Sequence, residues 1–406
     1  MKELNGKTIL MGVCGGIAVY KAVELLRLLV RSGADVHVVM TKAATEFVTP
    51  LTFQTLSGNP VSTELFNLYQ EKEIGHISLA DRADAVVIAP ATANIIGKLA
   101  NGIADDLLTT TVMASRAPLL VAPAMNVNMY ENPIYRENEE RLTRHGALLV
   151  PPEEGELACG VSARGRLASV DIICEAVKEL LTPKDLAGET IMVTAGPTRE
   201  ELDPVRYITN HSSGRMGFEI ARAARRRGAR VILVSGPTCI STPSGLEVLH
   251  VTTALEMRDA VMSRAEECTV IIKAAAVADY RPVQRHADKI KKKGENLVIE
   301  LEKNPDILAG LGALVSPPLL VGFAAETVDL IQNAAAKLEA KNLDMIVAND
   351  ITEEGAGFNV STNIARLFFR DGRSESFEKM EKLQLAGIIL DRVKWLLNQR
   401  RQQNPL

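Results

Sequence analysis

Two glycines at a strand-to-helix turn have the geometry to bind an anion. Residues 8–13 are continuously apolar, which predicts a buried parallel strand, and Gly15 and Gly16 follow it before a helix predicted over 17–32. Backbone N–H groups at the start of a helix bind phosphate groups. The turn lacks the full G-x-G-x-x-G spacing, so a tight turn without a ligand stays open as the alternative.

A second polar pair follows the apolar run 85–89. Thr92 and Asn94 stand directly before the next predicted helix. Both residue types cap helices, which is the simpler interpretation. The same hydroxyl and amide are also suited to hold the phosphate or the ring edge of a flavin.

The chain repeats its opening pattern, and the second copy carries an extra loop. Residues 184–192 echo residues 2–10, and the match resumes where residues 226–231 echo residues 31–36. The extra residues fall around 198–211, after the first strand of a predicted parallel sheet, where open α/β sheets bind ligands. A loop of about 15 residues inside a compact domain is usually functional, although a long capped loop is the alternative.

The second half collects side chains that bind anions and nucleotides. The loop contains Arg206 and Asn210, and the apolar strand 270–274 runs into small residues that let a base and a ribose approach the backbone. Asp279 follows this strand and suits a base or a ribose hydroxyl. Lys289 stands in a basic loop, and it is the lysine of that loop that we expect to reach a triphosphate.

Two further lysines, Lys337 and Lys341, are four residues apart and therefore share one face of a predicted helix. Both could simply face solvent, or both could grip phosphates. No cluster of carboxylates in the sequence identifies a metal site.

Strands that alternate with helices predict two doubly wound α/β domains. We expect a flavodoxin-like domain over 1–183 and a Rossmann-like, nucleotide-binding domain over 184–406. The further elements expected in the first domain are strands at 35–40, 119–122 and 148–150, helices at 80–83, 97–114 and 170–181, and a polar loop over 151–166. Those expected in the second are strands at 190–194, 231–235, 270–274, 319–323 and 345–348, and helices at 216–226 and 385–399.

Composition is that of an ordinary globular protein. Of the 406 residues, 47% are hydrophobic and 24% charged, and the length suits two or three domains. The net charge of −4 makes nucleic acid a poor partner, and no apolar run approaches the ~20 residues that cross a bilayer. The five scattered cysteines argue against a disulfide framework or a zinc site, and we expect a cytoplasmic protein.

Four short stretches of the first half belong together: Gly-His76, Ala-Pro-Ala-Thr-Ala-Asn94, Pro-Ala-Met-Asn126 and Ala-Cys159-Gly. Jointly they resemble the flavin-dependent cysteine decarboxylases, in particular the phosphopantothenoylcysteine decarboxylases. The resemblance implies FMN as the cofactor. The cofactor-binding residues that it implies are Gly15, Gly16, Thr41, Thr92 and Asn94.

The same resemblance implies a task for each remaining residue. Oxidation of the substrate thiol by hydride transfer to flavin provides the electron sink that loss of carbon dioxide needs. Cys159, on a loop over 153–166, is implied as the proton donor to the product. His76 is implied as the acid, base and positioning group near the flavin, and Asn126 as the group that binds the substrate carboxylate. Cys14 stands where relatives usually have a small hydroxyl residue.

The second half resembles the phosphopantothenate–cysteine ligases of the bacterial, CTP-using kind. In the reaction implied, the carboxylate of 4′-phosphopantothenate attacks the α-phosphate of CTP, and the amine of cysteine then displaces CMP from the acyl cytidylate. Mg²⁺ is expected to neutralise phosphate charge, at ligands that stay unknown. Asn210 is implied to stabilise the acyl cytidylate, Arg206 to bind substrate and Lys289 to neutralise charge. The implied CTP contacts are Lys273, Ala274, Ala275, Asp279, Lys289, Pro305, Asp306, Ile307, Leu308, Phe323, Lys337 and Lys341.

The two resemblances cover the whole chain and imply a bifunctional enzyme of coenzyme A biosynthesis. They also imply a homo-oligomer with trimeric flavin domains and dimeric ligase domains, a dodecamer overall. One alternative is a regulatory flavin-binding protein without decarboxylase activity, although the presence of both His76 and Cys159 argues against it. A second is an NAD(P)-dependent reductase in the second half, although the turn after Thr194 lacks the G-x-G-x-x-G spacing.

Overall fold

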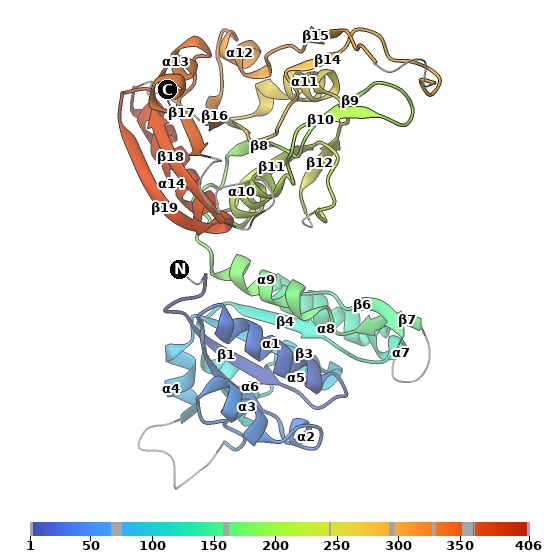
Figure 1. The fold of residues 1–406 in the computed structure, drawn as a ribbon. Helices are drawn as coiled ribbons and strands as arrows, with labels where there is room; N and C mark the ends of the chain where they lie inside the picture. The colour runs from blue at the N-terminus through green and yellow to red at the C-terminus, as the bar shows by residue number, and fades with distance from the viewer. Residues whose placement is uncertain are drawn as a thin grey trace. The chain divides into compact units, whose positions relative to one another are not determined.

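The computed structural model divides the chain into two compact units, residues 1–182 (unit 1) and 183–406 (unit 2) (Figure 1). The predicted boundary falls one residue later. Among the described residues, no helix is both long and apolar enough to span a membrane. The structure describes residues 3–65, 75–156, 162–242, 245–291, 297–326, 330–350, 360 and 362–403.

Unit 1 is built on a parallel sheet with the strand order β2-β1-β3-β4-β5. Its strands are β1 (Thr8–Val13), β2 (Asp35–Met40), β3 (Ala85–Ala91), β4 (Leu119–Pro123) and β5 (Leu148–Leu149). Ile9 of β1 lies opposite Val36 on one side and Ala85 on the other. This is the flavodoxin-like order, and the sheet reverses its winding between β1 and β3. The predicted fold class is therefore confirmed for this unit.

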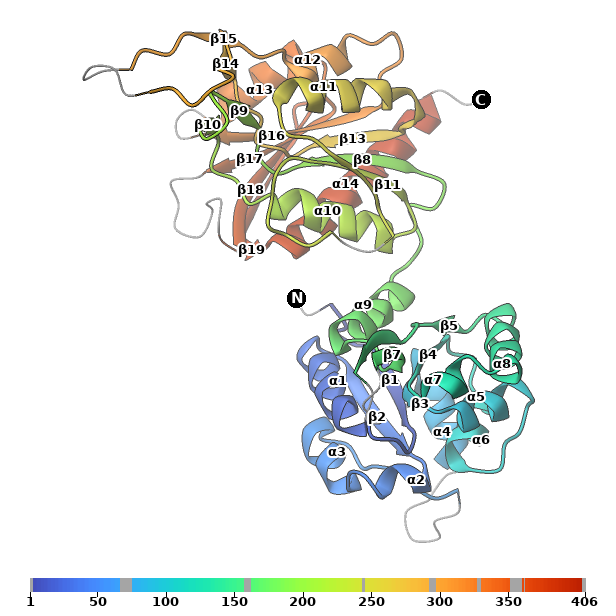
Figure 2. The ribbon, with the colours of Figure 1, turned by 90° about the vertical axis from the view of Figure 1, so that its right-hand side faces the viewer.

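Helices cover both faces of this sheet (Figure 2). On one face lie α1 (Val19–Arg31), α3 (Pro50–Ser57) and α9 (Val170–Leu181), whose apolar side chains share a core with alternate residues of the strands. On the other face lie α4 (Gly75–Arg82), α5 (Ala93–Ala100), α6 (Leu107–Ala114) and α8 (Pro133–Arg144). The short helices α2 (Lys42–Thr45) and α7 (Val127–Tyr130) follow β2 and β4.

Two predicted elements of unit 1 are wrong in detail. The helix predicted over 97–114 is two helices, because Asp106 caps α6 with its side chain, which accepts a hydrogen bond of 2.8 Å from the backbone N–H of Thr109. The polar loop predicted over 151–166 contains the antiparallel strands β6 (Glu153–Glu156) and β7 (Ser162–Arg166). The sequence analysis missed these strands because the segment is polar and has no alternating hydrophobic pattern.

Unit 2 has a larger sheet with the order β12-β11-β8-β13-β16-β17-β18-β19. Its strands are β8 (Thr190–Ala195), β11 (Arg230–Ser235), β12 (Glu247–His250), β13 (Val270–Lys273), β16 (Leu319–Glu326), β17 (Met345–Asp350), β18 (Thr362–Phe369) and β19 (Ser374–Glu381). The first six strands of the sheet are parallel and have the Rossmann order, with the reversal between β8 and β13. β18 and β19 extend the sheet antiparallel.

The sheet of unit 2 also lies between two helical layers. Helices α10 (Arg215–Arg226) and α14 (Lys382–Gln403) share a core on one face. Helices α11 (Ala254–Ser263), α12 (Ile307–Gly312) and α13 (Leu330–Ala340) lie on the other, with a 3-10 turn at Ala265–Glu267. The tail helix predicted over 385–399 is longer at both ends.

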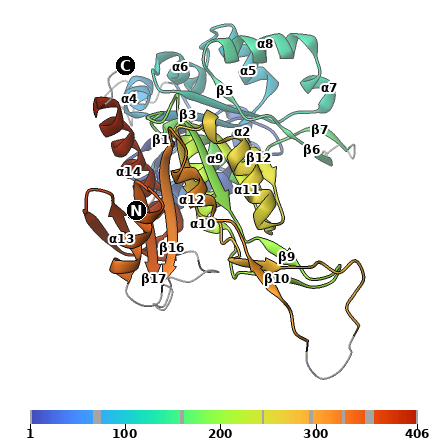
Figure 3. The same cartoon turned by 90° about the horizontal axis from the view of Figure 1, so that it is seen from above.

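The extra loop of the second copy is partly regular structure. It forms a hairpin of β9 (Arg199–Glu201) and β10 (Tyr207–Thr209). The hairpin lies beside a second pair, β14 (Tyr280–Pro282) and β15 (Leu301–Lys303), and both extend away from the main sheet (Figure 3). The loop interpretation was therefore incomplete, although the segment does follow β8 as expected.

Candidate functional site

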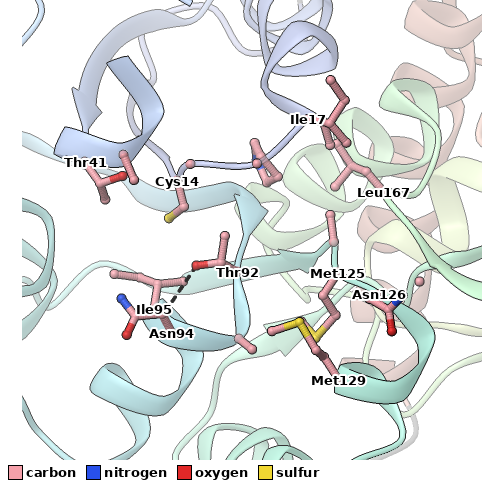
Figure 4. A pocket seen from close by; sticks show the side chains of 18 of the residues that line it. Cys14, Ile17, Thr41, Thr92, Asn94, Ile95, Met125, Asn126, Met129 and Leu167 are labelled. Atoms are coloured by element: carbon pink, nitrogen blue, oxygen red, sulfur yellow. Dashed lines mark hydrogen bonds between the residues drawn. The ribbon is translucent and has the colours of Figure 1, made fainter. Parts of the chain in front are cut away.

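Unit 1 contains a cavity of about 1090 Å³ at the carboxyl ends of β1, β3 and β4. This is the position at which the winding of the sheet reverses and where such sheets bind ligands. Figure 4 shows Cys14, Thr41 and Thr92 on one side of it, with Met125 and Met129 across from them. The sequence-predicted residues that line this cavity are Gly15, Gly16, Thr41, Thr92, Asn94 and Asn126.

Three of these side chains also cap helices, so the simpler interpretation holds alongside the functional one. The hydroxyl of Thr92 accepts a hydrogen bond of 3.4 Å from the N–H of Ile95, and Asn126 accepts one of 2.9 Å from the N–H of Asn128. Thr41 caps α2 in the same way. Each cap fixes a polar side chain at the cavity wall, and each threonine keeps its hydroxyl hydrogen to donate elsewhere.

Cys14 lies at the base of the cavity and is fully buried. Burial raises the pKa of its thiol to about 12, against a smaller lowering from a hydrogen bond with the backbone of Thr92. The thiol is therefore neutral at physiological pH. Cys14 therefore contributes a small uncharged surface to the cavity wall.

The two glycines of the turn, Gly15 and Gly16, differ in the space around them. A Cβ on Gly15 would lie 2.4 Å from the Cβ of Ala43 and 2.5 Å from its carbonyl carbon. A Cβ on Gly16 would meet nothing within 4 Å. Gly15 thus lets the turn pack directly against α2, whereas Gly16 faces open space.

We expect Gly15→Ala to destabilise unit 1 by about 1–3 kcal/mol, because the backbone at Ala43 has to move away. The matched variant Gly16→Ala is expected to change stability by no more than about 0.5 kcal/mol. Urea unfolding followed by circular dichroism measures both. Equal stability of the two variants would show that the close approach at Gly15 is not tight in solution.

Four basic residues that the sequence analysis missed also line the cavity: Lys21, Lys42, Lys98 and Arg166. Strand β7 brings Arg166 there because Gly165 packs on the backbone of Met125, whose N–H donates to the Gly165 carbonyl at 3.0 Å. Burial, and then the charge of Arg166, lower the pKa of Lys21. Two cations beside a glycine turn form a site for an anion such as a phosphate.

Two other residues, His76 and Cys159, were predicted for this site. His76 is the second residue of α4 and is half-buried, and it is not among the described residues that line the cavity. Cys159 lies outside the described residues. For both residues, a position near the ligand stays a prediction.

Unit 2 contains a second cavity, of about 530 Å³, at the carboxyl edge of its sheet. It lies beside the reversal between β8 and β13, as the position of the extra loop predicted. The predicted residues that line it are Asn210, Lys273, Ala274, Ala275, Asp279, Leu308, Phe323, Lys337 and Lys341. Residues more than a hundred positions apart in the sequence thus meet at one edge of the sheet.

Asn210 is anchored at this cavity. Its side-chain amide donates a hydrogen bond of 3.1 Å to the carbonyl of Val277, in the segment that follows β13. The amide also lies 3.5 Å from the carbonyl oxygen of Ala276. The loop after β10 is therefore tied to the strand end that also carries Lys273.

The remaining predicted residues of unit 2 have other contacts. Arg206 makes an ion pair of 2.7 Å with Asp203 and donates to the carbonyl of Ile290 at 2.8 Å. Burial raises the pKa of the Asp203 carboxyl. Hydrogen bonds from Arg206 and from three backbone N–H groups outweigh this effect and hold that pKa well below its usual range. Lys289 is exposed. The predicted residues that do not line the cavity are Arg206, Lys289, Pro305, Asp306 and Ile307.

Lys273 is the most perturbed cation of the cavity. Burial lowers the pKa of its ammonium to about 8, with Asp306 opposing and Lys341 assisting the shift. Asp306 caps α12 and makes an ion pair of 2.8 Å with Lys341. A lysine with a lowered pKa at a strand end is typical of a functional site.

The sequence analysis missed several residues of this cavity: Ser212, Ser213, Arg215, Asn349, Asn363 and Lys382. Asn349 had a readable signal, because it is a polar residue that follows the apolar run of β17. Lys382 had none, since its position depends on α14 returning to pack beside α10. Among the described residues, no group of three or more His, Cys, Asp or Glu side chains could hold a metal ion.

Comparisons with known proteins match both units. Residues 1–182 match the flavoprotein family model, and residues 186–396 match the model described as DNA/pantothenate metabolism flavoprotein C-terminal domain. The chain is 47% identical over 400 residues to the coenzyme A biosynthesis bifunctional protein CoaBC of Bacillus subtilis, covering 98% of each chain. It is 50% identical over 393 residues to the same-named protein of Vibrio cholerae, covering 96% of this chain and 98% of the relative.

A crystal structure of the C-terminal domain of a coenzyme A biosynthesis bifunctional protein CoaBC is also similar. It is 42% identical in sequence, and the match covers 53% of this chain and 99% of that domain with a TM-score of 0.47. The relatives from Bacillus subtilis and Vibrio cholerae carry both units together in one chain.

Proposed function

This chain belongs to the family of coenzyme A biosynthesis bifunctional proteins, and on that premise we propose how its two cavities divide the work. The chain is a bifunctional enzyme of coenzyme A biosynthesis, with a decarboxylase and a ligase activity. Ligation of cysteine to 4′-phosphopantothenate takes place in the cavity of unit 2. Decarboxylation of the product, 4′-phosphopantothenoylcysteine, takes place in the cavity of unit 1. The observation that carries the proposal is one cavity at the winding reversal of each sheet.

The cavity of unit 1 fits FMN. Gly16 leaves open space beside the turn, and the phosphate would accept hydrogen bonds from the backbone N–H groups there, with Lys21 and Arg166 balancing its charge. Thr92 and Asn94 would hold the ring edge, and Thr41 lies at the same wall. The volume of about 1090 Å³ suits a ligand of this size.

The protein side chains handle the substrate and the protons. FMN, when bound, provides the hydride acceptor and donor that an unactivated cysteine carboxylate needs to lose carbon dioxide. Asn126 at the cavity wall binds the substrate carboxylate and orients it. Cys159 gives a proton to the product carbon after carbon dioxide has left. His76 acts from outside the cavity of its own chain, which is consistent with a trimer in which neighbouring flavin domains complete each other's site.

The cavity of unit 2 takes CTP and 4′-phosphopantothenate. A carboxylate oxygen of the pantothenate attacks the α-phosphorus, the bond to the bridging oxygen breaks, and pyrophosphate leaves with the electron pair. The amine of cysteine then attacks the acyl carbon, releases CMP and loses a proton. Lys273, Lys337 and Lys341 neutralise phosphate charge, and Asn210 donates a hydrogen bond to the acyl cytidylate.

Further parts of the proposal come from the resemblance. Mg²⁺ would accompany the triphosphate and neutralise part of its charge, at ligands that stay unknown. Arg206 and Lys289 act from the β9–β10 side of the unit, where dimeric ligase domains would bring a second copy. The full assembly is a cytoplasmic dodecamer of trimeric flavin domains and dimeric ligase domains.

The direct test follows pyrophosphate and carbon dioxide in one tube. Purified protein receives 4′-phosphopantothenate, cysteine and either CTP or ATP. Pyrophosphate with CTP alone, followed by carbon dioxide, is the expected result. Pyrophosphate without carbon dioxide would limit the chain to ligase activity, and the absence of both from a folded, yellow protein would favour a regulatory flavoprotein.

The lowered pKa of Lys273 predicts a pH dependence of CTP binding. Below about pH 8 the lysine is charged and attracts the triphosphate, and the charge is lost as the pH rises through about 8. We therefore expect the Kd for CTP, measured by calorimetry, to rise up to about fivefold from pH 8 to pH 9, because the charged fraction of Lys273 falls from about one half to about one tenth.

Lys273→Arg separates this lysine from other titrating groups. Arginine stays charged across the range, so the variant is expected to bind CTP with a flat pH profile. A profile in Lys273→Arg as steep as that of the native protein would assign the titration to another group.

A further inference from the structure

Asp203 is a buried carboxylate that the proposed mechanism does not use. It lies in the connection 202–206 between β9 and β10, its side chain is fully buried, and it does not line the cavity of unit 2. Its two oxygens accept five hydrogen bonds: from the backbone N–H groups of Val205 and Arg206 at 2.8 Å each, from Nε and Nη2 of Arg206 at 3.0 and 2.7 Å, and from the N–H of Ile290 at 3.1 Å. These donors fill the acceptor capacity of a carboxylate, so the groups around Asp203 have one arrangement that satisfies it.

Arg206 is held along one edge and remains open at the other. Its Nε and Nη2 both donate to Oδ2 of Asp203, and Nη2 also donates to the carbonyl of Ile290 at 2.8 Å. Nη1 has no hydrogen-bond partner among the described residues, and 40% of the side chain is exposed. Because a guanidinium is planar, contacts along one edge fix the direction of the remaining N–H groups. Arg206 therefore presents a fixed donor to an anion such as a carboxylate or a phosphate.

The segment that carries Lys289 is attached to the same carboxylate. Residues 283–291 form no helix or strand, so their position depends on contacts with other parts of unit 2. Ile290 provides two of these contacts, because its N–H donates to Asp203 and its carbonyl accepts from Arg206. Lys289 directly precedes Ile290 and is exposed. Two cations that lie far apart in the sequence thus start from the two sides of one hydrogen-bonded junction, formed by Asp203, Arg206 and Ile290.

The junction adds little to the hydrophobic core of unit 2. Its hairpin, β9–β10, extends away from the main sheet (Figure 3), and none of residues 199–209 belongs to the two hydrophobic clusters of this unit. A buried pair of an aspartate and an arginine also contributes little net stability, because both charges lose water on folding. What the pair does provide is a defined geometry, since each hydrogen bond holds only in a narrow range of distance and angle.

We infer that Asp203 is a positioning residue of the ligase: it orients the guanidinium of Arg206 and holds the segment of Lys289 beside it. The inference rests on the proposed ligase function, which assigns substrate binding to Arg206 and charge neutralisation to Lys289. Asp203 itself does not touch the substrate, because its oxygens are buried and already accept hydrogen bonds. Its contribution is that both cations are in place before the substrate arrives, so that binding costs less ordering of side chains.

Asp203→Asn opens the junction with almost no change in side-chain size. Whichever way the new amide is turned, its nitrogen faces at least two of the N–H donors that the carboxylate now accepts from. We expect kcat/KM for 4′-phosphopantothenate, measured by pyrophosphate release with CTP, to fall at least about tenfold. Trypsin cleavage of the folded protein after Lys289, located by mass spectrometry, is expected to become at least about tenfold faster.

A double-variant cycle separates positioning from a general structural defect. If Asp203 acts through Arg206, adding Asp203→Asn to Arg206→Met lowers kcat/KM by at most about threefold, whereas independent effects multiply. Asp185→Asn is the matched control, because Asp185 also accepts from Nε and Nη2 of an arginine, Arg227, at 2.8 Å each and does not line the cavity. We expect this control to keep kcat/KM and the rate of cleavage after Lys289 within about twofold of the native values.

Three outcomes overturn the inference: native kcat/KM in folded Asp203→Asn, slower ligation with unchanged cleavage after Lys289, and effects that multiply in the cycle. If Asp203→Asn does not fold, Ile290→Pro is the second variant, because it removes the N–H that donates to Asp203 and keeps the carboxylate with its arginine. The same fall in kcat/KM is expected there, and native kcat/KM would overturn the inference. These outcomes refute the inference alone as long as the native protein releases pyrophosphate with CTP, and a native protein that releases none refutes the proposed function too.

Discussion

Asn210→Asp is expected to lower the rate of ligation by about 10²–10³ while decarboxylation of supplied 4′-phosphopantothenoylcysteine continues at the native rate. The native amide donates to the carbonyl of Val277 at 3.1 Å, so a carboxylate would place an acceptor against an acceptor. It would also bring a negative charge to a cavity that takes a triphosphate. At about 4 Å and an effective dielectric constant of about 20, two like charges repel by about 4 kcal/mol.

The control for this variant carries the same change of charge outside the cavity. Asn342 is exposed, its amide donates to the carbonyl of Gly312 at 2.9 Å, and it does not line the cavity. Asn342→Asp is therefore expected to ligate at nearly the native rate. Loss of both activities in Asn210→Asp would indicate a folding defect, and native ligation would remove Asn210 from the mechanism.

The sequence predicted those parts of the fold in which local pattern and tertiary structure agree. Continuously apolar runs such as 8–13 became central parallel strands, because strands covered by helices on both faces need no polar face. Glycine turns after the first strand of each half marked the winding reversals. The two cavities followed from these positions, and most of the predicted ligand residues line them.

The residues that could not be predicted are those whose position depends on distant packing. Lys382 reaches its cavity only because α14 packs beside α10, more than 150 residues away in the sequence. Arg206 resembles a free anion-binding residue in the sequence, yet in the fold it pairs with the buried Asp203. The residue type shows which interactions a side chain can form. The fold determines which of them it does form.

His76 is one predicted residue of unit 1 that is not among the described residues lining the cavity. The family resemblance implies a place near the flavin, and the single chain puts His76 outside the cavity. The trimer proposed above would reconcile the two, because a neighbouring copy would bring its α4 to the rim of the cavity.

Cys159→Ser is expected to keep the flavin spectrum and to lower formation of 4′-phosphopantetheine by about 10²–10⁴. A serine hydroxyl has nearly the size of a thiol and is a much weaker acid, so the variant would bind substrate but fail to protonate the product carbon. Strand β7, which begins at Ser162, carries Arg166 to the cavity wall.

The matched control for this variant is Cys239→Ser, which changes an exposed cysteine of unit 2. Carbon dioxide and 4′-phosphopantetheine are measured separately, because a missing proton donor acts after carbon dioxide has left. Carbon dioxide released in the first turnover without a matching amount of product would place Cys159 at the protonation step. Loss of both together would instead assign it to substrate binding, and full turnover would exclude it from the chemistry and leave a donor still to be found in the cavity wall.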